Sequence, residues 1–138
     1  MAGPQDPPSA ATETLLPTEH QAVAPDGSYV RLLCQMSAGS FAQFELPAGE
    51  TARAVRHRTI TEIWYITEGL GKMWRGESPD TGREIDLRPG VCLTIPPELS
   101  FQFRSTSGRP LVAVAVTMPP WPGEGEAVPA EGPWPATV

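Results

Sequence analysis

The chain of 138 residues is long enough to bury one sizeable core, and its 17 Pro and 13 Gly favour short strands joined by turns. All ten Lys and Arg lie between positions 31 and 109, so the net charge of −6 comes from acidic residues near the two ends. A near-neutral body with acidic ends lacks the basic surface of nucleic-acid-binding proteins and the basic amphipathic stripe of membrane-surface proteins.

The ends of the chain differ in composition from its middle. Residues 1–25 are rich in Pro, Ala and Thr and predict a flexible arm, in which His20 is an exposed loop residue. Residues 26–118 predict a single domain. Residues 119–138 predict a Pro/Gly/Glu-rich tail that is partly docked, with Trp121 held against the domain and the last residues loose.

The sequence carries no targeting signal that we recognise. The N-terminus lacks a basic segment followed by an apolar run, and no stretch has the length of a membrane span. Cys34 and Cys92 are far apart and form no CxxC pair, which favours two free thiols. We therefore expect a cytoplasmic protein with no nucleic-acid or membrane partner.

Short segments with the two-residue period of strands follow one another along the domain. Turn residues separate them, and no segment has a helical period. This pattern predicts an all-β antiparallel sandwich or barrel. The expected strands are 29–36, 41–46, 52–57, 62–68, 69–77, 83–90, 91–97, 100–105 and 111–118.

Alternation assigns side chains to faces in some of these strands. In 100–105, Phe101 and Phe103 are expected to point inward and Gln102 outward, whereas the continuous apolar run 111–118 predicts a strand buried on both faces. In 41–46 alternation leaves two interpretations open. Gln43 and Glu45 lie either inside or on the solvent face, and we favour Gln43 inside.

The stretch 49–69 concentrates the candidate chemistry. It predicts two strands joined by a tight turn, with a glycine at each end. One face of these strands would carry one imidazole and one carboxylate among apolar side chains. The residues of this face are Val55, His57, Glu62, Trp64 and Ile66.

The spacing in this stretch resembles the first motif of the cupin superfamily. That motif runs from a glycine through two histidines and a glutamate to a closing glycine, and Gly49, His57, Glu62 and Gly69 match it, with Val55 in place of the first histidine. The second motif falls at 90–105. Gly90 and Pro96 match it, while Glu98 replaces a glycine, Phe101 replaces the fourth ligand and Ser105 replaces an asparagine.

The resemblance implies a small jelly-roll barrel, or double-stranded β-helix, that commonly forms a homodimer. It also implies a divalent metal (Fe, Mn, Ni or Zn) held by His57 and Glu62. Because Val55 and Phe101 cannot coordinate a metal, further ligands would have to come from Gln43, Glu45 or Cys34. We therefore favour a protein without a tightly bound cofactor.

Three interpretations of His57 and Glu62 stay open: an altered metal site, an acid–base pair that works without metal, and a buried hydrogen bond without function. Around this pair we expect a pocket for a small organic molecule. Its expected ligand contacts are Gln43, Arg53, Val55, Trp64, Phe101 and Phe103. The favoured function is a metal-independent isomerase, cyclase or lyase. The alternatives are a metal-dependent dioxygenase or isomerase and a non-catalytic binding or sensory protein.

Overall fold

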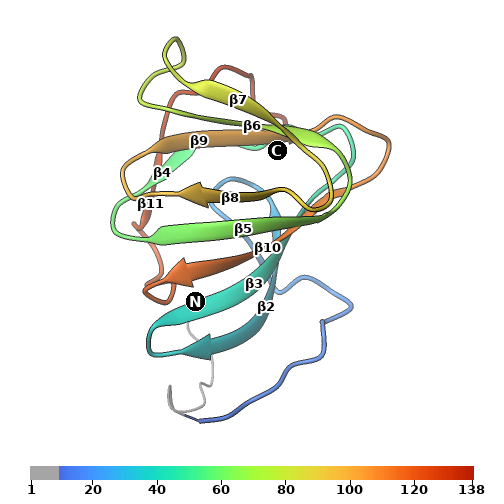
Figure 1. Ribbon diagram of the computed structural model, residues 1–138, viewed down its shortest axis with the longest axis vertical. Coiled ribbons are helices and arrows are strands. Elements are labelled where there is room, and N and C mark those ends of the chain that lie inside the picture. Colours follow the sequence, from blue (N-terminus) through green and yellow to red (C-terminus); the bar gives the residue numbers. More distant parts are fainter. Residues whose placement is uncertain (1–9) are drawn as a thin grey trace.

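The computed structural model describes residues 10–138, and within this range every regular element is a strand. The predicted all-β fold is therefore confirmed (Figure 1). The strands are β1 Ala22–Val23, β2 Tyr29–Met36, β3 Gly39–Leu46, β4 Val55–His57, β5 Thr61–Glu68, β6 Gly71–Gly76, β7 Arg83–Leu87, β8 Cys92–Ile95, β9 Ser100–Ser105, β10 Leu111–Met118 and β11 Ala127–Pro129.

The strands form two sheets in which every pairing between strands is antiparallel. One sheet has the order β1-β2-β3-β10-β5-β8 and the other has the order β11-β4-β9-β6-β7. From β3 to β11, consecutive strands lie in different sheets except for β6 and β7, so the chain crosses repeatedly between the layers (Figure 1). This arrangement brings the two ends of the 49–69 stretch to opposite walls of one interior.

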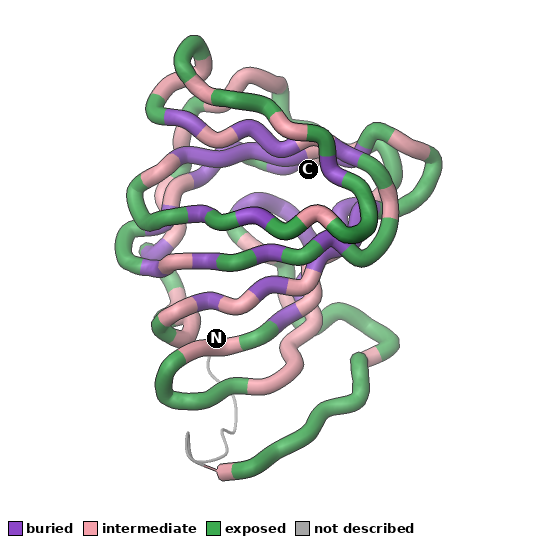
Figure 2. Tube along the Cα trace, in the orientation of Figure 1, coloured by how far each residue is buried: buried purple, intermediate pink, exposed green. Residues whose placement is uncertain are grey.

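The core lies between the two sheets, where buried residues recur at every second position (Figure 2). In β5 this period places Glu62, Trp64 and Ile66 inward and leaves Ile63 and Tyr65 exposed. The fully buried apolar side chains of the core include Leu46, Trp64, Ile66, Met73, Leu87, Ile95 and Phe101. The predicted inward face of the 49–69 stretch is therefore confirmed.

A motif glycine closes the β5–β6 turn for a steric reason. Gly69 has φ +82°, and an added Cβ would lie 2.3 Å from the carbonyl oxygen of Pro110. Only glycine fits this close approach without a shift of the backbone. Through this turn the chain passes from β5 in the first sheet to β6 in the second.

The C-terminal segment differs from the prediction, because its last residues are docked rather than loose. The backbone nitrogen of Thr137 donates to the carbonyl oxygen of Thr51 at 2.9 Å, and Val138 packs against the core. Strand β11 pairs with β4 at the edge of the second sheet, and Trp134 lies against Gln102 on the outer face of that sheet. Of the predicted N-terminal arm, residues 1–9 lie outside the described range, and Thr14 donates to the carbonyl of Leu33 in β2.

Two further residue groups differ from the expectation in their burial. Gln102 lies on the outward face, opposite Phe101 and Phe103, but is 1 % exposed because the C-terminal segment lies over it. Strand β10 was expected to be buried on both faces, but Val114 and Val116 are only half-buried. No second layer covers their side of the sheet within the described residues, so that face is partly open to solvent.

Candidate functional site

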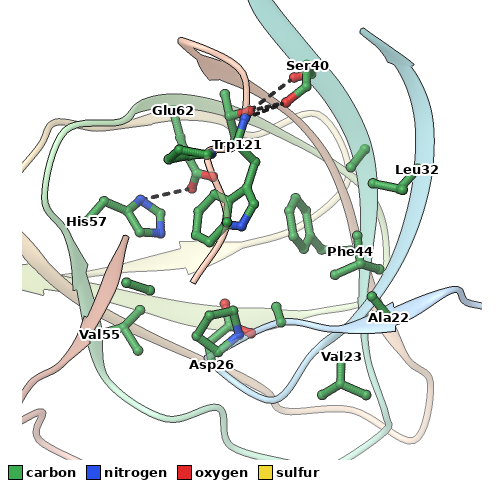
Figure 3. Close-up of a pocket in the computed structure, with 18 of the residues that line it drawn as sticks. Ala22, Val23, Asp26, Leu32, Ser40, Phe44, Val55, His57, Glu62 and Trp121 are labelled. Atoms are coloured by element: carbon green, nitrogen blue, oxygen red, sulfur yellow. Dashed lines mark hydrogen bonds and ion pairs between the residues drawn. The ribbon is translucent and has the colours of Figure 1, made fainter. Parts of the chain in front are cut away.

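A cavity of about 600 Å³ opens between the sheets, within the usual size range for a small-molecule pocket. Segments from both ends of the chain complete its walls, since residues 22–26 and 121–125 line it together with the barrel strands. Figure 3 shows His57 and Glu62 on one side of this space and Leu32 and Phe44 on the other. The lining residues are Ala22, Val23, Ala24, Pro25, Asp26, Val30, Leu32, Ser40, Phe41, Ala42, Phe44, Val55, His57, Glu62, Trp64, Thr117, Trp121, Pro122, Gly123, Glu124, Gly125 and Ala127.

His57 ends β4 and Glu62 lies near the start of β5, and the turn between them is held by Glu126. The carboxylate of Glu126 accepts hydrogen bonds from the backbone nitrogens of Thr59 (2.8 Å) and Ile60 (3.0 Å) and from the hydroxyl of Thr59 (2.6 Å). Burial opposes ionisation of Glu126, but these donors outweigh it and hold the pKa of Glu126 below its usual value. A docked part of the tail therefore positions the two candidate side chains.

The imidazole of His57 is buried between aromatic rings. Phe101 and Trp121 both pack edge-on against it, with ring centroids 5.2 and 5.3 Å away. Nδ1 has no hydrogen-bond partner among the described residues and faces Glu62, while Nε2 points towards the cavity (Figure 3). Burial lowers the pKa of His57 to about 4, although the negative charge of Glu126 raises it in part, so the ring is neutral at pH 7.

Glu62 is also almost fully buried, and its Oε1 accepts a hydrogen bond of 2.9 Å from Nε1 of Trp64. Burial raises the pKa of Glu62 to about 8, which outweighs the opposing effect of this hydrogen bond, and the charges of Asp26 and Glu126 raise it further. The distance of 3.8 Å between His57 Nδ1 and Glu62 Oε1 would suit an ion pair. At pH 7, however, both groups are neutral, and the pair is a carboxylic acid beside a free imidazole.

Asp26 is a third polar residue of the cavity wall that our sequence analysis did not single out. Its Oδ1 accepts hydrogen bonds from the backbone nitrogen (2.9 Å) and the hydroxyl (2.6 Å) of Ser28. Burial raises the pKa of Asp26 despite these two hydrogen bonds and the nearby charge of Arg53. The Asp-Gly-Ser sequence signals only a turn, so nothing in it indicated that this turn would close onto the cavity.

The structure brings together only part of the expected ligand-binding set. Val55 and Trp64 line the cavity, whereas Phe101 and Phe103 lie in the core behind it. Gln43 lies outside it and instead accepts a long hydrogen bond from Arg31. Arg53 is exposed, and its Nε donates to the carbonyl oxygen of Val138 at 2.9 Å.

Position relative to the strands explains both outlying residues. Gln43 shares its side of β3 with Glu45, which pairs with Arg31 at 2.7 Å on the outer face of the sheet. Arg53 precedes β4 in an irregular segment, where the period of two no longer predicts direction. Trp121, by contrast, is a cavity wall that alternation could not have found, because it lies in the tail.

The residues present do not fit the metal that the cupin motifs imply. Val55 and Phe101 occupy two of the four ligand positions, and Val55 pairs directly with Phe101 across β4 and β9. Within residues 10–138, His57 and Glu62 belong to no group of three His, Cys, Asp or Glu that could hold a metal. The replacement ligands considered above lie elsewhere, since Glu45 binds Arg31 and Cys34 contacts Thr14. A tight divalent site generally needs three protein ligands.

Comparison with known proteins supports the fold and the family. The family model for the Cupin domain matches residues 42–117, which include both motif regions, 49–69 and 90–105. The chain therefore belongs to the cupin family. Within residues 10–138 the fold offers no helix that could cross a membrane.

Proteins similar to this chain share little sequence identity with it. It is 26% identical over 122 residues to the uncharacterized protein MJ1618 of Methanocaldococcus jannaschii, covering 82% of this chain and 94% of that protein. It also resembles the solved structure of KdgF from Halomonas sp., with a TM-score of 0.64 and 14% identity over 78% of this chain and 94% of the other.

A Klebsiella pneumoniae protein with a double-stranded beta-helix domain gives a TM-score of 0.63 and 14% identity, covering 80% of this chain and 90% of the other. At these identities the structural likeness concerns the fold alone.

Proposed function

We propose that this cupin binds a small organic molecule in its barrel and moves a proton on it, with Glu62 as acid and His57 as base and without a tightly held metal. The reaction class is that of an isomerase, cyclase or lyase that acts next to a carbonyl group. The observation that carries the proposal is one wall of the cavity, where the buried carboxyl of Glu62 lies beside the imidazole of His57, whose Nδ1 has no hydrogen-bond partner among the described residues.

The protonation states of the two groups suit this chemistry. At pH 7 Glu62 holds a proton that it can donate, and His57 holds a free lone pair that can accept one. Two titratable neighbours whose pKa values are pushed apart in this way are typical of acid–base sites. Trp64, which donates to Glu62 Oε1, leaves Oε2 as the oxygen available to carry the acidic proton.

The proton transfers balance within the pair. His57 Nε2 takes a proton from the carbon next to the ligand carbonyl while Glu62 gives its proton to the carbonyl oxygen, which yields an enol, an imidazolium and a carboxylate. In an α-hydroxy ketone this enol is an enediol. Transfer of the proton from His57 to the former carbonyl carbon, while Glu62 takes the proton of the other hydroxyl group, gives the isomeric carbonyl compound and restores both residues. In a β-hydroxy ketone, His57 protonates the departing hydroxyl group as water while Glu62 takes back the enol proton, which gives the unsaturated ketone of a lyase reaction.

The test uses compounds with exchangeable protons next to a carbonyl. The purified protein is incubated in D₂O with a panel of α-hydroxy ketones and β-hydroxy ketones, and deuterium uptake and conversion are followed by NMR. We expect Glu62→Gln and His57→Ala each to lower the exchange rate by about 10²–10⁴-fold. Glu68→Gln, an exposed change on the same strand, is the control.

Three outcomes would contradict the proposal. Exchange that survives unchanged in both variants would exclude this acid–base pair. Stoichiometric Fe, Mn, Ni or Zn in the purified protein that disappears in His57→Ala would favour the metal-dependent alternative. Retention of a molecule from a metabolite extract without any conversion would favour the non-catalytic binding protein.

We further propose that the protein is a homodimer, as the cupin resemblance implies. The open face of the first sheet supports this, because Phe41 and Ile63 are each 39% exposed and both pair with the half-buried Val116. Tyr65, 48% exposed, extends the same face. A contiguous exposed apolar face of this kind is typical of an interaction surface.

A further inference from the structure

We infer that the ligand of this cavity is an uncharged molecule with an apolar, ring-sized body, and that carboxylates and phosphates are excluded. This inference rests on the proposed function, since it names the class of molecule on which the His57–Glu62 pair would act. Three observations support it: the charge of the residues that line the cavity, the partners of the nearby arginines, and the hydrogen bonds of the hydroxyl groups in the lining.

The first observation is the sign of the charged residues in the lining. Among the described residues that form the cavity there is no Lys or Arg, whereas Asp26, Glu62 and Glu124 all contribute to its walls. An anionic ligand would lose its hydration there and meet carboxyl groups instead of a counterion. Desolvation of a charge that finds no counterion opposes binding strongly, and so does contact with a carboxylate such as that of Glu124 at the cavity wall.

The second observation is that the nearby arginines are committed elsewhere. Arg53 bonds to the C-terminal carbonyl and is exposed, and Arg56 lies 3.7 Å from the carboxylate of Glu98. Arg31 pairs with Glu45 and donates to the carbonyl oxygen of Pro17 on the outer face of the sheet. None of the three lines the cavity, so none of them forms part of a carboxylate-binding site there.

The third observation is that the hydroxyl groups of the lining are already engaged. Ser40 and Thr117 form a short hydrogen bond with each other, and Ser40 Oγ also accepts from the backbone nitrogen of Trp121 (Figure 3). The remaining wall is largely apolar and includes the rings of Phe44 and Trp121. Polar recognition is therefore concentrated at the acidic and imidazole groups, and the rest of the cavity suits a hydrophobic ring.

Three probes with one ring system test the inference: 2-naphthol, 2-naphthoate and 2-naphthamide. Their dissociation constants for the full chain are measured by calorimetry at pH 7. We expect naphthol and naphthamide to bind at least about tenfold more tightly than naphthoate. Equal or tighter binding of naphthoate would overturn the inference, and so would failure of all three probes to bind at millimolar concentration.

A charge introduced into the wall provides a second measurement. Leu32→Lys should raise the affinity for naphthoate by at least about tenfold and leave that for naphthamide within a few-fold, whereas Leu32→Met should change neither. If Leu32→Lys leaves naphthoate binding unchanged, the cavity is not where the probes bind and the inference fails. Tight naphthoate binding alongside Glu62-dependent deuterium exchange would reject only the ligand class. Selective naphthamide binding without any exchange would reject only the proposed reaction.

Discussion

Phe101 packs edge-on against His57 with 5.2 Å between the ring centroids, at the position where the cupin motif would place a fourth metal ligand. The first missing ligand position, Val55, is directly opposite Phe101 in the β4–β9 pair. Two apolar side chains therefore fill one side of a coordination sphere whose other side is still formed by His57 and Glu62. The loss of metal ligands and the neutral state of this pair have a common cause, since apolar neighbours supply neither a cation nor water.

Restoring both ligand positions should restore metal binding. We expect the double variant Val55→His/Phe101→His to bind a divalent transition metal at about one per chain, because three imidazoles and a carboxylate then converge. Elemental analysis, after incubation with Ni²⁺ or Mn²⁺ and dialysis to remove free metal, measures the metal bound per chain. Val55→His alone, with three ligands, should bind more weakly. If the double variant is folded by circular dichroism but binds no metal, the barrel does not hold these four side chains in the geometry of a metal site.

The raised pKa of Glu62 predicts that replacing this residue stabilises the protein at alkaline pH. The unfolded chain ionises Glu62 near pH 4.5, whereas the folded chain does so only near 8, so the unfolded state binds fewer protons between these values. The free energy that the protonated Glu62 contributes to stability is therefore complete below pH 4.5 and is lost as the pH rises towards 8. Glu62→Gln should be more stable than the natural chain by on the order of 3 kcal/mol at pH 8 and by little at pH 4.5.

Urea unfolding at pH 4.5, 6 and 8 measures this difference, and Glu68→Gln on the same strand should follow the natural chain at every pH. If Glu62→Gln is less stable than the natural chain at pH 8, the folded protein stabilises the ionised carboxylate of Glu62 rather than its protonated form. The pair would then be a salt bridge, and the proposed assignment of acid and base would be reversed.

The two-residue period explains which parts of the site could be predicted. Because strands alternate strictly, the inward direction of His57, Glu62 and Trp64 followed from the sequence, and the motif spacing supplied the fold. Trp121 and Asp26 could not be predicted as cavity walls. Both lie in irregular segments at the ends of the domain, and only tertiary packing directs such segments onto a barrel.

The same limit explains the error at Gln102. Alternation correctly placed Gln102 on the opposite face from Phe101 and Phe103, but a polar residue on that face was expected to meet solvent. The C-terminal segment covers this face, and the amide satisfies the backbone of the covering segment. A pattern within one strand carries no information about a segment that arrives from thirty residues further along the chain.

The dimer that we propose should depend on the open face of the first sheet. Ile63→Glu places a charge between Tyr65 and Val116 and should convert a dimer to a monomer, as measured by light scattering after gel filtration. Thr81→Glu, in the exposed turn between β6 and β7 of the second sheet, serves as the control. A natural chain that is monomeric at all concentrations would contradict the dimer directly.

Replacing Glu98 by glycine should stabilise the protein. Glu98 adopts φ +68°, in the left-handed region, at a position where the cupin motif has a glycine. A residue with a Cβ is disfavoured there by about 1–2 kcal/mol, while glycine loses about 0.5–1 kcal/mol through the entropy of the unfolded chain. We expect Glu98→Gly to stabilise the protein by roughly 0.5–1 kcal/mol in urea unfolding. Glu98→Ala keeps the strained backbone and should give no gain. An equal gain in both variants would assign the effect to the lost charge.

Removing the side chain that binds the docked tail, in Gln102→Ala, should cause the largest loss of stability among these variants. Gln102 Nε2 donates to the carbonyl oxygens of Ala52 and Trp134, both at 2.8 Å, and its Oε1 accepts from the nitrogen of Trp134 at 3.2 Å. Gln102→Ala would leave these buried backbone groups without partners, and we expect a loss of about 2–4 kcal/mol. Arg104→Ala removes only the cation–π contact of 4.4 Å with the Trp134 ring and should cost about 0.5–1 kcal/mol.

Urea unfolding compares these two variants, and limited proteolysis reports on the tail itself. If the docked segment is held through Gln102, cleavage after residue 130 should accelerate in Gln102→Ala far more than in Arg104→Ala. Because Glu126 in the same tail fixes the turn between His57 and Glu62, a released tail should also weaken the site. Equal cleavage rates in the natural chain and Gln102→Ala would show that other contacts, such as those of Thr137 and Val138, hold the segment in place.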